Sequence, residues 1–235
     1  MQWLIGLLVN TLLLIPAWPA KLLTFAGLAS AWILGVLVWG VFGWQGYCVI
    51  LVYFALGTLV TKLGFARKVA LGIAEKRGGM RGPENVWGSA LTASVCALGF
   101  LLLPNPAWQL AYTASLATKL SDTTASEVGK AYGKRTFLIT TLRPVPPGTE
   151  GAVSLEGTLA GVLGSLVLAL VGLAVGFVHP MGVLWCLVAA FVATTCESLI
   201  GATLQEQGFL TNETVNIINT AIGALVAAAL GLLAQ

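Results

Sequence analysis

Charge is scarce in this 235-residue chain: only 9% of the residues are Asp, Glu, Lys or Arg, whereas 57% are apolar. A soluble domain carries about 25% charged residues, so the composition excludes a water-soluble globule. The formal net charge is +3, and no basic face stands apart from the apolar runs. Nucleic acid is therefore not expected as a partner.

Histidine and paired cysteines are also scarce. The only histidine is His179, and the four cysteines lie in apolar runs without a C-x-x-C pair. We interpret the thiols as reduced, small apolar side chains. The chain has no G-x-x-x-x-G-K-[ST], no protein-kinase motif set, no H-E-x-x-H and no zinc-ligand spacing. These absences exclude the enzyme classes that depend on those motifs.

Long apolar runs predict an all-α, polytopic membrane protein, because one span needs about 20 apolar residues. Their Pro and Gly breakers divide a single membrane domain, 1–235, into about eight transmembrane helices. The first run lacks the basic leader of a signal peptide, so we expect it to remain as a span. The expected spans are 2–16, 22–42, 46–62, 86–103, 108–128, 152–177, 183–204 and 214–234.

The few charges predict how the spans are oriented. Charge-free turns occur at 43–46, 104–107 and 179–180, and every other connection carries Lys, Arg or Glu. The positive-inside rule places the charged connections on the cytoplasmic face, or its topological equivalent, and both termini on the opposite face. Charges inside the spans lie in the halves nearest that same face, which predicts one cavity open to one side.

The first charged loop, 63–85, is basic and cytoplasmic in this topology. Its apolar residues Phe65, Val69 and Ile73 fit an interfacial amphipathic helix. The alternative is a solvated loop that touches anionic lipid headgroups.

The end of this loop carries a candidate phosphate site. Arg77 and Arg81 flank two glycines, which allow the backbone to approach an anion while the arginines bind its oxygens. Glu84 and Asn85 then begin the next helix, whose free N–H groups favour anions.

The fifth span is unusually polar, and such a helix is costly in lipid unless it lines protein or water. Asp122 and Glu127 are its acidic residues, and each has a lysine three residues away, Lys119 or Lys130. One interpretation is that these pairs simply neutralise themselves. The other is that the carboxylates bind Mg²⁺ together with substrate phosphates.

Helix geometry limits the second interpretation. Residues five apart lie about 140° apart around a regular helix, so Asp122 and Glu127 do not share a face. Joint binding of one metal ion requires other helices or a helix break, which Gly129 and Gly133 would permit.

A second cytoplasmic loop, 129–151, is rich in Pro and Gly. The segment from Arg143 to Gly151 cannot be helical, because its prolines lack a backbone donor. Gly148 and Thr149 would present backbone N–H groups to phosphate; an ordinary linker is the alternative.

The last two spans add further polar groups near the charged face. Glu197 lies about two turns from the end of its helix, where snorkelling to the surface is the alternative role. Three asparagines of the final span share one helix face beside Glu213, where interhelical hydrogen bonding is the alternative. They are Asn212, Asn216 and Asn219.

Without an imidazole near the charged face, the chemistry must use a nucleophile that needs little deprotonation. A phosphate monoester fits, because its second pKa of about 6 leaves it anionic at pH 7. Phosphoryl transfer then depends mainly on positioning and on charge neutralisation.

Four segments resemble a known integral-membrane family: RGGMRGPENVWGSA at 77–90, SDTTASEVGKAYG at 121–133, FLITTLRPVPPGTEGAVSLEGTLAG at 137–161, and the region 196–224. This family includes phytyl-phosphate kinase of the tocopherol and phylloquinone pathway and transmembrane protein 19. More distantly, the motifs resemble the cytidylyltransferase and dolichol-kinase superfamily. The chain has TNETVN at 211–216 where that superfamily has a P-G-H-G-G-x-x-D-R type of motif.

The resemblance implies a kinase in a cyanobacterial-type or plastid membrane. It would transfer a phosphoryl group from a nucleoside triphosphate, CTP, to an isoprenoid monophosphate such as phytyl phosphate, with Mg²⁺ as cofactor. Catalytic roles would fall to Asp122, Glu127, Glu197 and Arg143, with the three carboxylates as metal ligands. Substrate or nucleotide contacts would fall to Arg77, Arg81, Asn85, Gly148, Thr149, Asn212, Glu213, Asn216 and Asn219.

Two other functions remain open at this point. A CTP-dependent nucleotidyltransferase acting on a lipid phosphate would use similar groups but release pyrophosphate. A transporter of a small solute or ion would bind near the midplane with access to both faces, which the charge-free half of the chain disfavours. A homo-oligomer is compatible with either function.

Overall fold

The computed structural model describes residues 1–234, without the side chain of Lys76. The chain is an all-α bundle, as predicted, with one small two-stranded sheet within the described range. The long helices are α1 (Gln2–Ala17), α2 (Phe25–Lys62), α4 (Pro83–Leu102), α5 (Pro106–Tyr132), α6 (Leu155–Ala174), α7 (Pro180–Ile200) and α8 (Asn212–Leu233). The short elements are α3 (Phe65–Ala70), η1 (Lys76–Gly79), β1 (Phe137–Leu138), β2 (Ala152–Val153) and the π-helical turn η2 (Gly201–Gln205).

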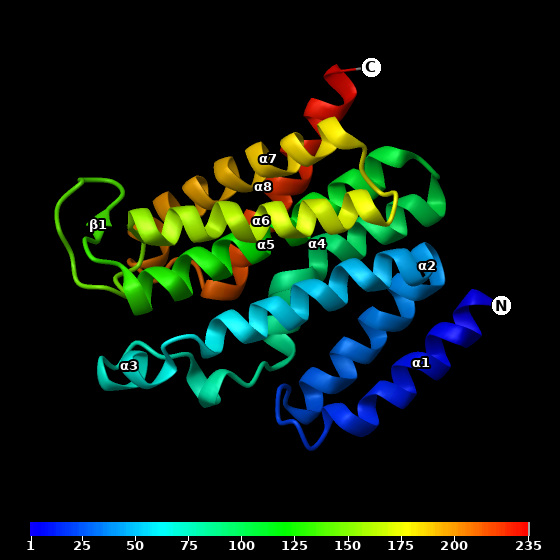
Figure 1. Ribbon diagram of the computed structural model, residues 1–235, viewed down its shortest axis with the longest axis horizontal. Coiled ribbons are helices and arrows are strands. Elements are labelled where there is room, and N and C mark those ends of the chain that lie inside the picture. The colour runs from blue at the N-terminus through cyan, green and yellow to red at the C-terminus, as the bar shows by residue number, and fades with distance from the viewer. Residues whose placement is uncertain (235) are drawn as a thin grey trace.

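Helix α2 contains two of the predicted spans. Its backbone is non-helical at Gly43, where φ is 65° and ψ is −158°. This left-handed conformation favours glycine, and Figure 1 shows the chain reversing its direction within α2. The predicted turn at 43–46 is therefore real, although the break consists of essentially one residue.

Five helices within the described chain are long and apolar enough to cross a membrane: α2, α4, α6, α7 extended through η2, and α8. Helix α1 is apolar but has only 16 residues. Helix α5 has 27 residues, but its polar composition keeps it outside this group. Each predicted span overlaps a helix or one arm of α2, and five helices have the length and apolarity of a membrane span. Helix α5 depends on its neighbours for shielding.

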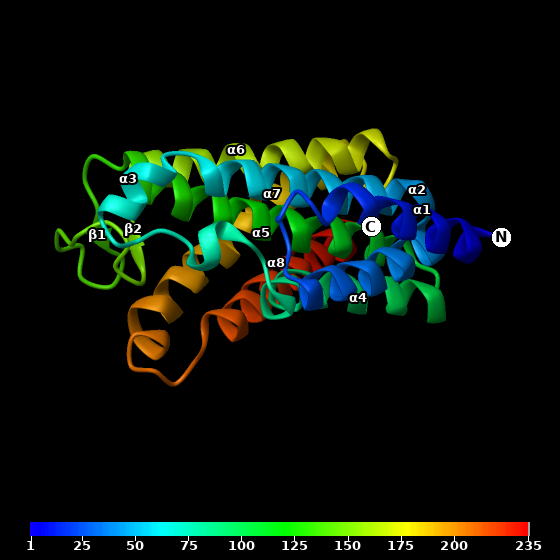
Figure 2. The same ribbon diagram turned by 90° about the horizontal axis from the view of Figure 1, so that it is seen from below.

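Helix α5 lies at the centre of the bundle and packs against α2, α4, α6, α7 and α8 (Figure 2). Every residue from Leu110 to Asp122 is buried. The contact with α6 is especially close, since a Cβ added at Gly157 would lie 2.6 Å from the Ala125 carbonyl oxygen. At Gly161, one turn further, the same Cβ would lie 3.0 Å from the Ser121 carbonyl oxygen. Small residues at four-residue spacing let two membrane helices approach at backbone distance.

The non-helical segments gather at one end of the bundle. Figures 1 and 2 show α3, β1, β2 and the turn between α7 and α8 at the left, and the N-terminus at the far right. The predicted interfacial helix of the first charged loop is reduced to the six residues of α3. This charged end is the one at which the sequence predicts a cavity.

Candidate active site

A cluster of polar side chains lies inside the bundle where α5, α7 and α8 meet. The ammonium of Lys119 donates hydrogen bonds to Asp122 Oδ2 at 2.5 Å and to Asn216 Oδ1 at 2.6 Å. Glu197 lies on α7, which packs against both α5 and α8, and its side chain is half-buried. We call Lys119, Asp122, Asn216 and Glu197 the Lys119 cluster. Its hydrogen bonds join α5 to α8, because Asp122 and Asn216 share Lys119 as a partner.

Asn219 extends this cluster deeper into the bundle. It lies one turn from Asn216 on the same face of α8 and is fully buried. Neither its amide nitrogen nor its amide oxygen has a hydrogen-bond partner within the described residues. An unpaired buried amide costs free energy, and a native structure usually supplies water or a ligand for such a group.

The second acidic residue of α5 belongs to a separate cluster. Glu127 forms a buried ion pair with Lys68 of α3, whose ammonium also donates to the Thr61 carbonyl oxygen at 2.7 Å. Lys130 Nζ lies 3.5 Å from Glu127 Oε1 and 3.6 Å from Glu75 Oε1. We call Lys68, Glu75, Glu127 and Lys130 the Lys68 cluster.

The break that would unite the two acidic residues of α5 does not occur, because the helix continues through Gly129 to Tyr132. Asp122 and Glu127 therefore keep different neighbours and different faces. Within residues 1–234 no three acidic, histidine or cysteine side chains converge on one metal position. The structure thus does not assemble Asp122, Glu127 and Glu197 as one ligand set.

Both lysine pairs considered from the sequence are formed, Lys119 with Asp122 and Lys130 with Glu127. Sequence reasoning missed Lys68, which is completely buried. The burial of Lys68 could have been expected from its position three residues after Phe65, which places it on the apolar face of the expected helix. Sequence reasoning also missed Tyr53, whose buried hydroxyl accepts a hydrogen bond from Arg81 at 3.2 Å.

The first charged loop separates its two arginines. The backbone runs through left-handed conformations at Arg77, Gly78 and Gly79, with φ values of 54°, 67° and 83°. The exposed Arg77 side chain pairs with Glu84 and reaches Asn85 Oδ1 at 3.5 Å. Arg77 and Asn85 are thus together, as predicted, but Arg77 already has a carboxylate partner.

Arg81 lies in a different environment. It is half-buried, its guanidinium donates to the Tyr53 hydroxyl at 3.2 Å, and it stacks 5.6 Å from the ring centroid of Phe54. Its backbone pairs with the segment before α2, since Thr24 N–H donates to the Arg81 carbonyl at 3.0 Å. Within the described residues no carboxylate lies within ion-pair distance of Arg81. A half-buried arginine without a carboxylate is a candidate anion contact.

The second charged loop lies across the end of the bundle. Gly148 packs against Ile73 of the first loop, with φ of 88°, and a Cβ at Gly151 would lie 2.5 Å from the Ser198 carbonyl oxygen next to Glu197. Arg143 is exposed, and Thr149 Oγ1 donates to the Pro146 carbonyl at 2.8 Å. The loop therefore contacts the end of α7 through Gly151, whereas Arg143 is free of ion pairs within residues 1–234.

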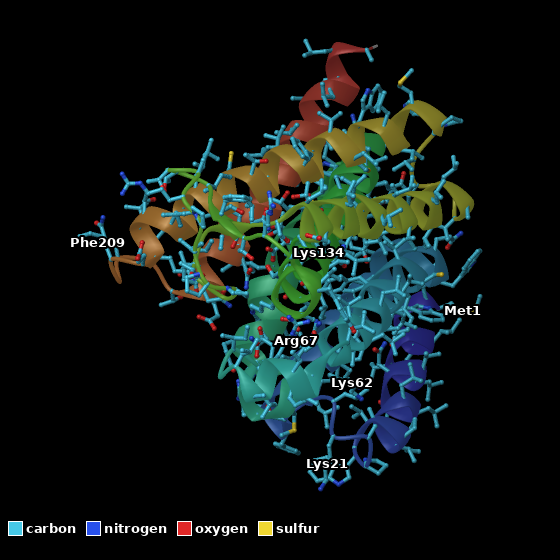
Figure 3. The ribbon with its side chains drawn as sticks, turned by 60° about the vertical axis from the view of Figure 1, so that its left-hand side comes forward. Met1, Lys21, Lys62, Arg67, Lys134 and Phe209 are labelled. Atoms are coloured by element: carbon cyan, nitrogen blue, oxygen red, sulfur yellow. The ribbon has the colours of Figure 1, made fainter. Side chains whose placement is uncertain are left out.

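Glu150 connects this loop to the Lys119 cluster electrostatically. The pKa of its carboxyl is raised, chiefly by partial desolvation and further by the charges of Asp122 and Glu75, although Lys130 lowers it. Figure 3 brings this charged end forward, with Lys62, Arg67 and Lys134 on it. Glu150 and these basic residues thus belong to the same end of the bundle.

The remaining predicted residues lie at the start of α8. Asn212 is exposed in the first turn, where the Thr211 hydroxyl caps the helix by accepting from Thr214 N–H at 3.3 Å. Glu213 lies against α4, where a Cβ at Gly88 would be 3.4 Å from the Glu213 Cα. Asn216 and Asn219 point into the bundle, but Asn212 does not join them.

Comparisons with known proteins agree with the membrane fold. Residues 8–224 match the family described as Integral membrane protein DUF92. An uncharacterized membrane protein of Synechocystis is 57% identical over 99% of this chain and 93% of its own length. Protein VTE6, chloroplastic, of Arabidopsis thaliana is 45% identical over 87% of this chain and 64% of its own length. An uncharacterized membrane protein of Methanocaldococcus jannaschii is 32% identical over 94% of this chain and 91% of its own length. No solved structure gives a significant match.

Proposed function

The chain belongs to the DUF92 family of integral membrane proteins, and we propose that it is a kinase that phosphorylates an isoprenoid monophosphate. The donor is a nucleoside triphosphate, CTP, and the preferred acceptor is phytyl phosphate, which becomes phytyl diphosphate. The motif resemblance described above supports this activity. The similarity to the chloroplast protein VTE6 supports a photosynthetic membrane as the location of this chain.

One observation carries the proposal: Lys119, Asp122 and Asn216 form a buried hydrogen-bonded group toward the charged end, and the Asn219 amide beside it has no partner within the described residues. A cluster that served only helix packing would satisfy its own hydrogen bonds. An open cluster with both signs of charge suits a polyphosphate and its counterion instead.

The reaction needs no general base. The acceptor phosphate is already largely dianionic at neutral pH, because its second pKa is about 6. One of its oxygens attacks the γ-phosphorus of the triphosphate, the bond to the β–γ bridging oxygen breaks, and a nucleoside diphosphate leaves with that electron pair. Lys119 and Arg81 would neutralise charge on the phosphates and hold them in line. His179 caps the other end of α7 and takes no part.

The residues fit Mg²⁺ bound together with the nucleotide. Magnesium typically uses one or two protein carboxylates along with substrate phosphates. Asp122 and Glu197 would supply the carboxylates and Asn216 an amide oxygen, with Asp122 exchanging its contact with Lys119 for the ion. Glu127 lies on another face of α5 between Lys68 and Lys130. When bound, the ion would offset negative charge on the transferring phosphoryl group.

We propose that the charged end faces the cytoplasm or stroma, where nucleotides are available, and that both termini face the opposite side. The basic residues at this end support that orientation. Labelling of single cysteines from either side of the membrane tests it. Accessible cysteines near Arg143 on the face away from the nucleotides would reverse the topology.

Product analysis tests the activity. Purified full-length protein is incubated with labelled CTP, ATP or GTP and with phytyl, geranylgeranyl or farnesyl monophosphate. We expect labelled prenyl diphosphate and a nucleoside diphosphate. Pyrophosphate together with a nucleotide-linked lipid would identify a nucleotidyltransferase, and solute uptake into proteoliposomes without nucleotide would identify a transporter.

A further inference from the structure

An apolar cavity of about 370 Å³ lies between α1, the two arms of α2 and the start of α4, outside the Lys119 cluster. Its walls are almost entirely hydrocarbon and include Leu14, Leu28, Ala31, Ile50 and Ala90. This volume lies in the range of small-molecule sites, about 300–1,000 Å³. The cavity is thus large enough for one ligand chain.

The two ends of the cavity differ in chemistry. Arg81 and Asn85 contribute to one end, which is the charged end of the bundle. At the other end the Tyr47 hydroxyl donates to Asn10 Oδ1 at 2.8 Å, and a Cβ at Gly35 would lie only 1.9 Å from that oxygen. That end is therefore closed by a hydrogen-bonded pair whose polar atoms are already satisfied.

The length of the cavity follows from α2. Gly27 lies against the Arg81 carbonyl, with 2.6 Å from its ideal Cβ to the oxygen, and Gly35 lies against Asn10. At 1.5 Å rise per residue these two points are about 12 Å apart. An arginine at the mouth and hydrocarbon along the walls match a molecule with one anionic head and one apolar tail.

Arg81 also positions the headgroup end of the cavity. Its guanidinium donates to the buried Tyr53 hydroxyl at 3.2 Å, and both side chains line the cavity. A headgroup held at Arg81 would therefore lie beside Tyr53 and Asn85 at the charged end of the bundle.

We propose that this cavity holds the apolar chain of a single-chain phosphate monoester, with the phosphate on Arg81 and the Asn10–Tyr47 pair limiting the length of the enclosed chain. The identification of the ligand as the kinase acceptor rests on the proposed function. The cavity itself makes a separate prediction: the chain binds there without any nucleotide.

The test measures binding of labelled phytyl monophosphate to full-length protein in detergent, without nucleotide. Ala31 lines the cavity, whereas Ala29 on the same helix is exposed. We expect Ala31→Trp to weaken binding by at least about 10-fold because it fills the cavity, and Ala29→Trp to change it by less than about twofold. Equal affinities of the two variants would overturn the proposal.

A second measurement guards against misfolding of the tryptophan variant. A phytyl monophosphate with a photoreactive group near the end of its tail is crosslinked to the wild-type protein. Label on peptides from α1, α2 or α4 that line the cavity supports the proposal, and label confined to other helices overturns it. Phosphatidic acid, which has two chains, is then added as a competitor to test whether the cavity prefers a single chain. If it displaces phytyl monophosphate completely at equal concentration, the cavity is not specific for a single-chain ligand.

The headgroup end has its own variant. Arg81→Gln should weaken phytyl monophosphate by about 10-fold yet leave phytol, which lacks the phosphate, unchanged. Equal loss for both ligands would remove the phosphate from Arg81. Tight binding that depends on Ala31, without any turnover, would support the binding cavity and overturn the proposed kinase activity. Turnover that is insensitive to Ala31→Trp would support the kinase activity and overturn the cavity as the acceptor site.

Discussion

Two buried ion pairs lie five residues apart on α5, and they differ in how completely the protein satisfies them. Lys68 binds Glu127 and the Thr61 carbonyl, and Lys130 lies near the same carboxylate while it also pairs with Glu75. Lys119 binds Asp122 and Asn216, but the neighbouring Asn219 amide has no partner within the described chain. The first pair has the features of a structural contact that fastens α3 to α5. The second has the features of a ligand-binding site.

The largest effect should follow from Asp122→Asn, which removes a carboxylate from the open pair. We expect turnover of phytyl phosphate with CTP to fall by at least about 100-fold, because the positions of Lys119 and the nucleotide counterion depend on that charge. Rates are measured in proteoliposomes, with folding followed by size-exclusion chromatography and circular dichroism. Near-normal turnover would remove Asp122 from the site.

Glu127→Gln tests the closed pair and should act on stability instead. Loss of the carboxylate leaves Lys68 buried without its counterion, which typically costs about 3 kcal/mol. Thermal unfolding in detergent measures the loss, and turnover per folded molecule should change little. The double variant Lys68→Met with Glu127→Leu provides the control, since replacing the whole pair should recover most of the stability. Inactivity of a folded Glu127→Gln protein would move this carboxylate into the catalytic machinery.

Asn219→Leu sharpens the contrast further. The substitution removes a buried amide that has no partner among residues 1–234, so we expect a melting temperature higher by about 2–4 °C. The same change should lower kcat/KM for the nucleotide by about 10-fold if the amide binds a ligand. Asn212→Ala, at an exposed position of the same helix, serves as the control. A stabilised variant with full activity would show that Asn219 is a packing defect and not a binding group.

The smallest effect should come from the loop above the open pair. Arg143 is exposed and has no carboxylate partner within the described residues, so Arg143→Ala should raise the KM for CTP or phytyl phosphate by only about threefold to tenfold. Arg67→Ala removes an equally exposed positive charge from α3 and controls for net charge. Unchanged KM values for both substrates would leave Arg143 with a role in topology alone.

Much of the fold could be predicted from patterns in the sequence. Local composition, together with helix-breaking Pro and Gly residues, predicts the break at Gly43 and the positions of the other helices. It also predicts the polarity of α5. Candidate site residues were harder to group, because residues distant in the chain decide which of them meet. Glu127 illustrates this: its partner Lys68 is 59 positions away and lies in a segment that the sequence predicts at the membrane surface. The apolar cavity could not be predicted either, since its walls come from α1, α2 and α4.

The sequence by itself determined that this chain spans a membrane, because its apolar runs are long enough to cross the hydrocarbon core. It also determined that the charges collect at one end, because charged side chains are costly inside that hydrocarbon. Helix periodicity also determined that Asp122 and Glu127 face different directions. Only the tertiary structure decided which of the two lies between two lysines and which lies beside an amide that has no partner in the described part of the chain. That choice depends on packing between α3, α5, α7 and α8, where contacts join residues that no local pattern relates.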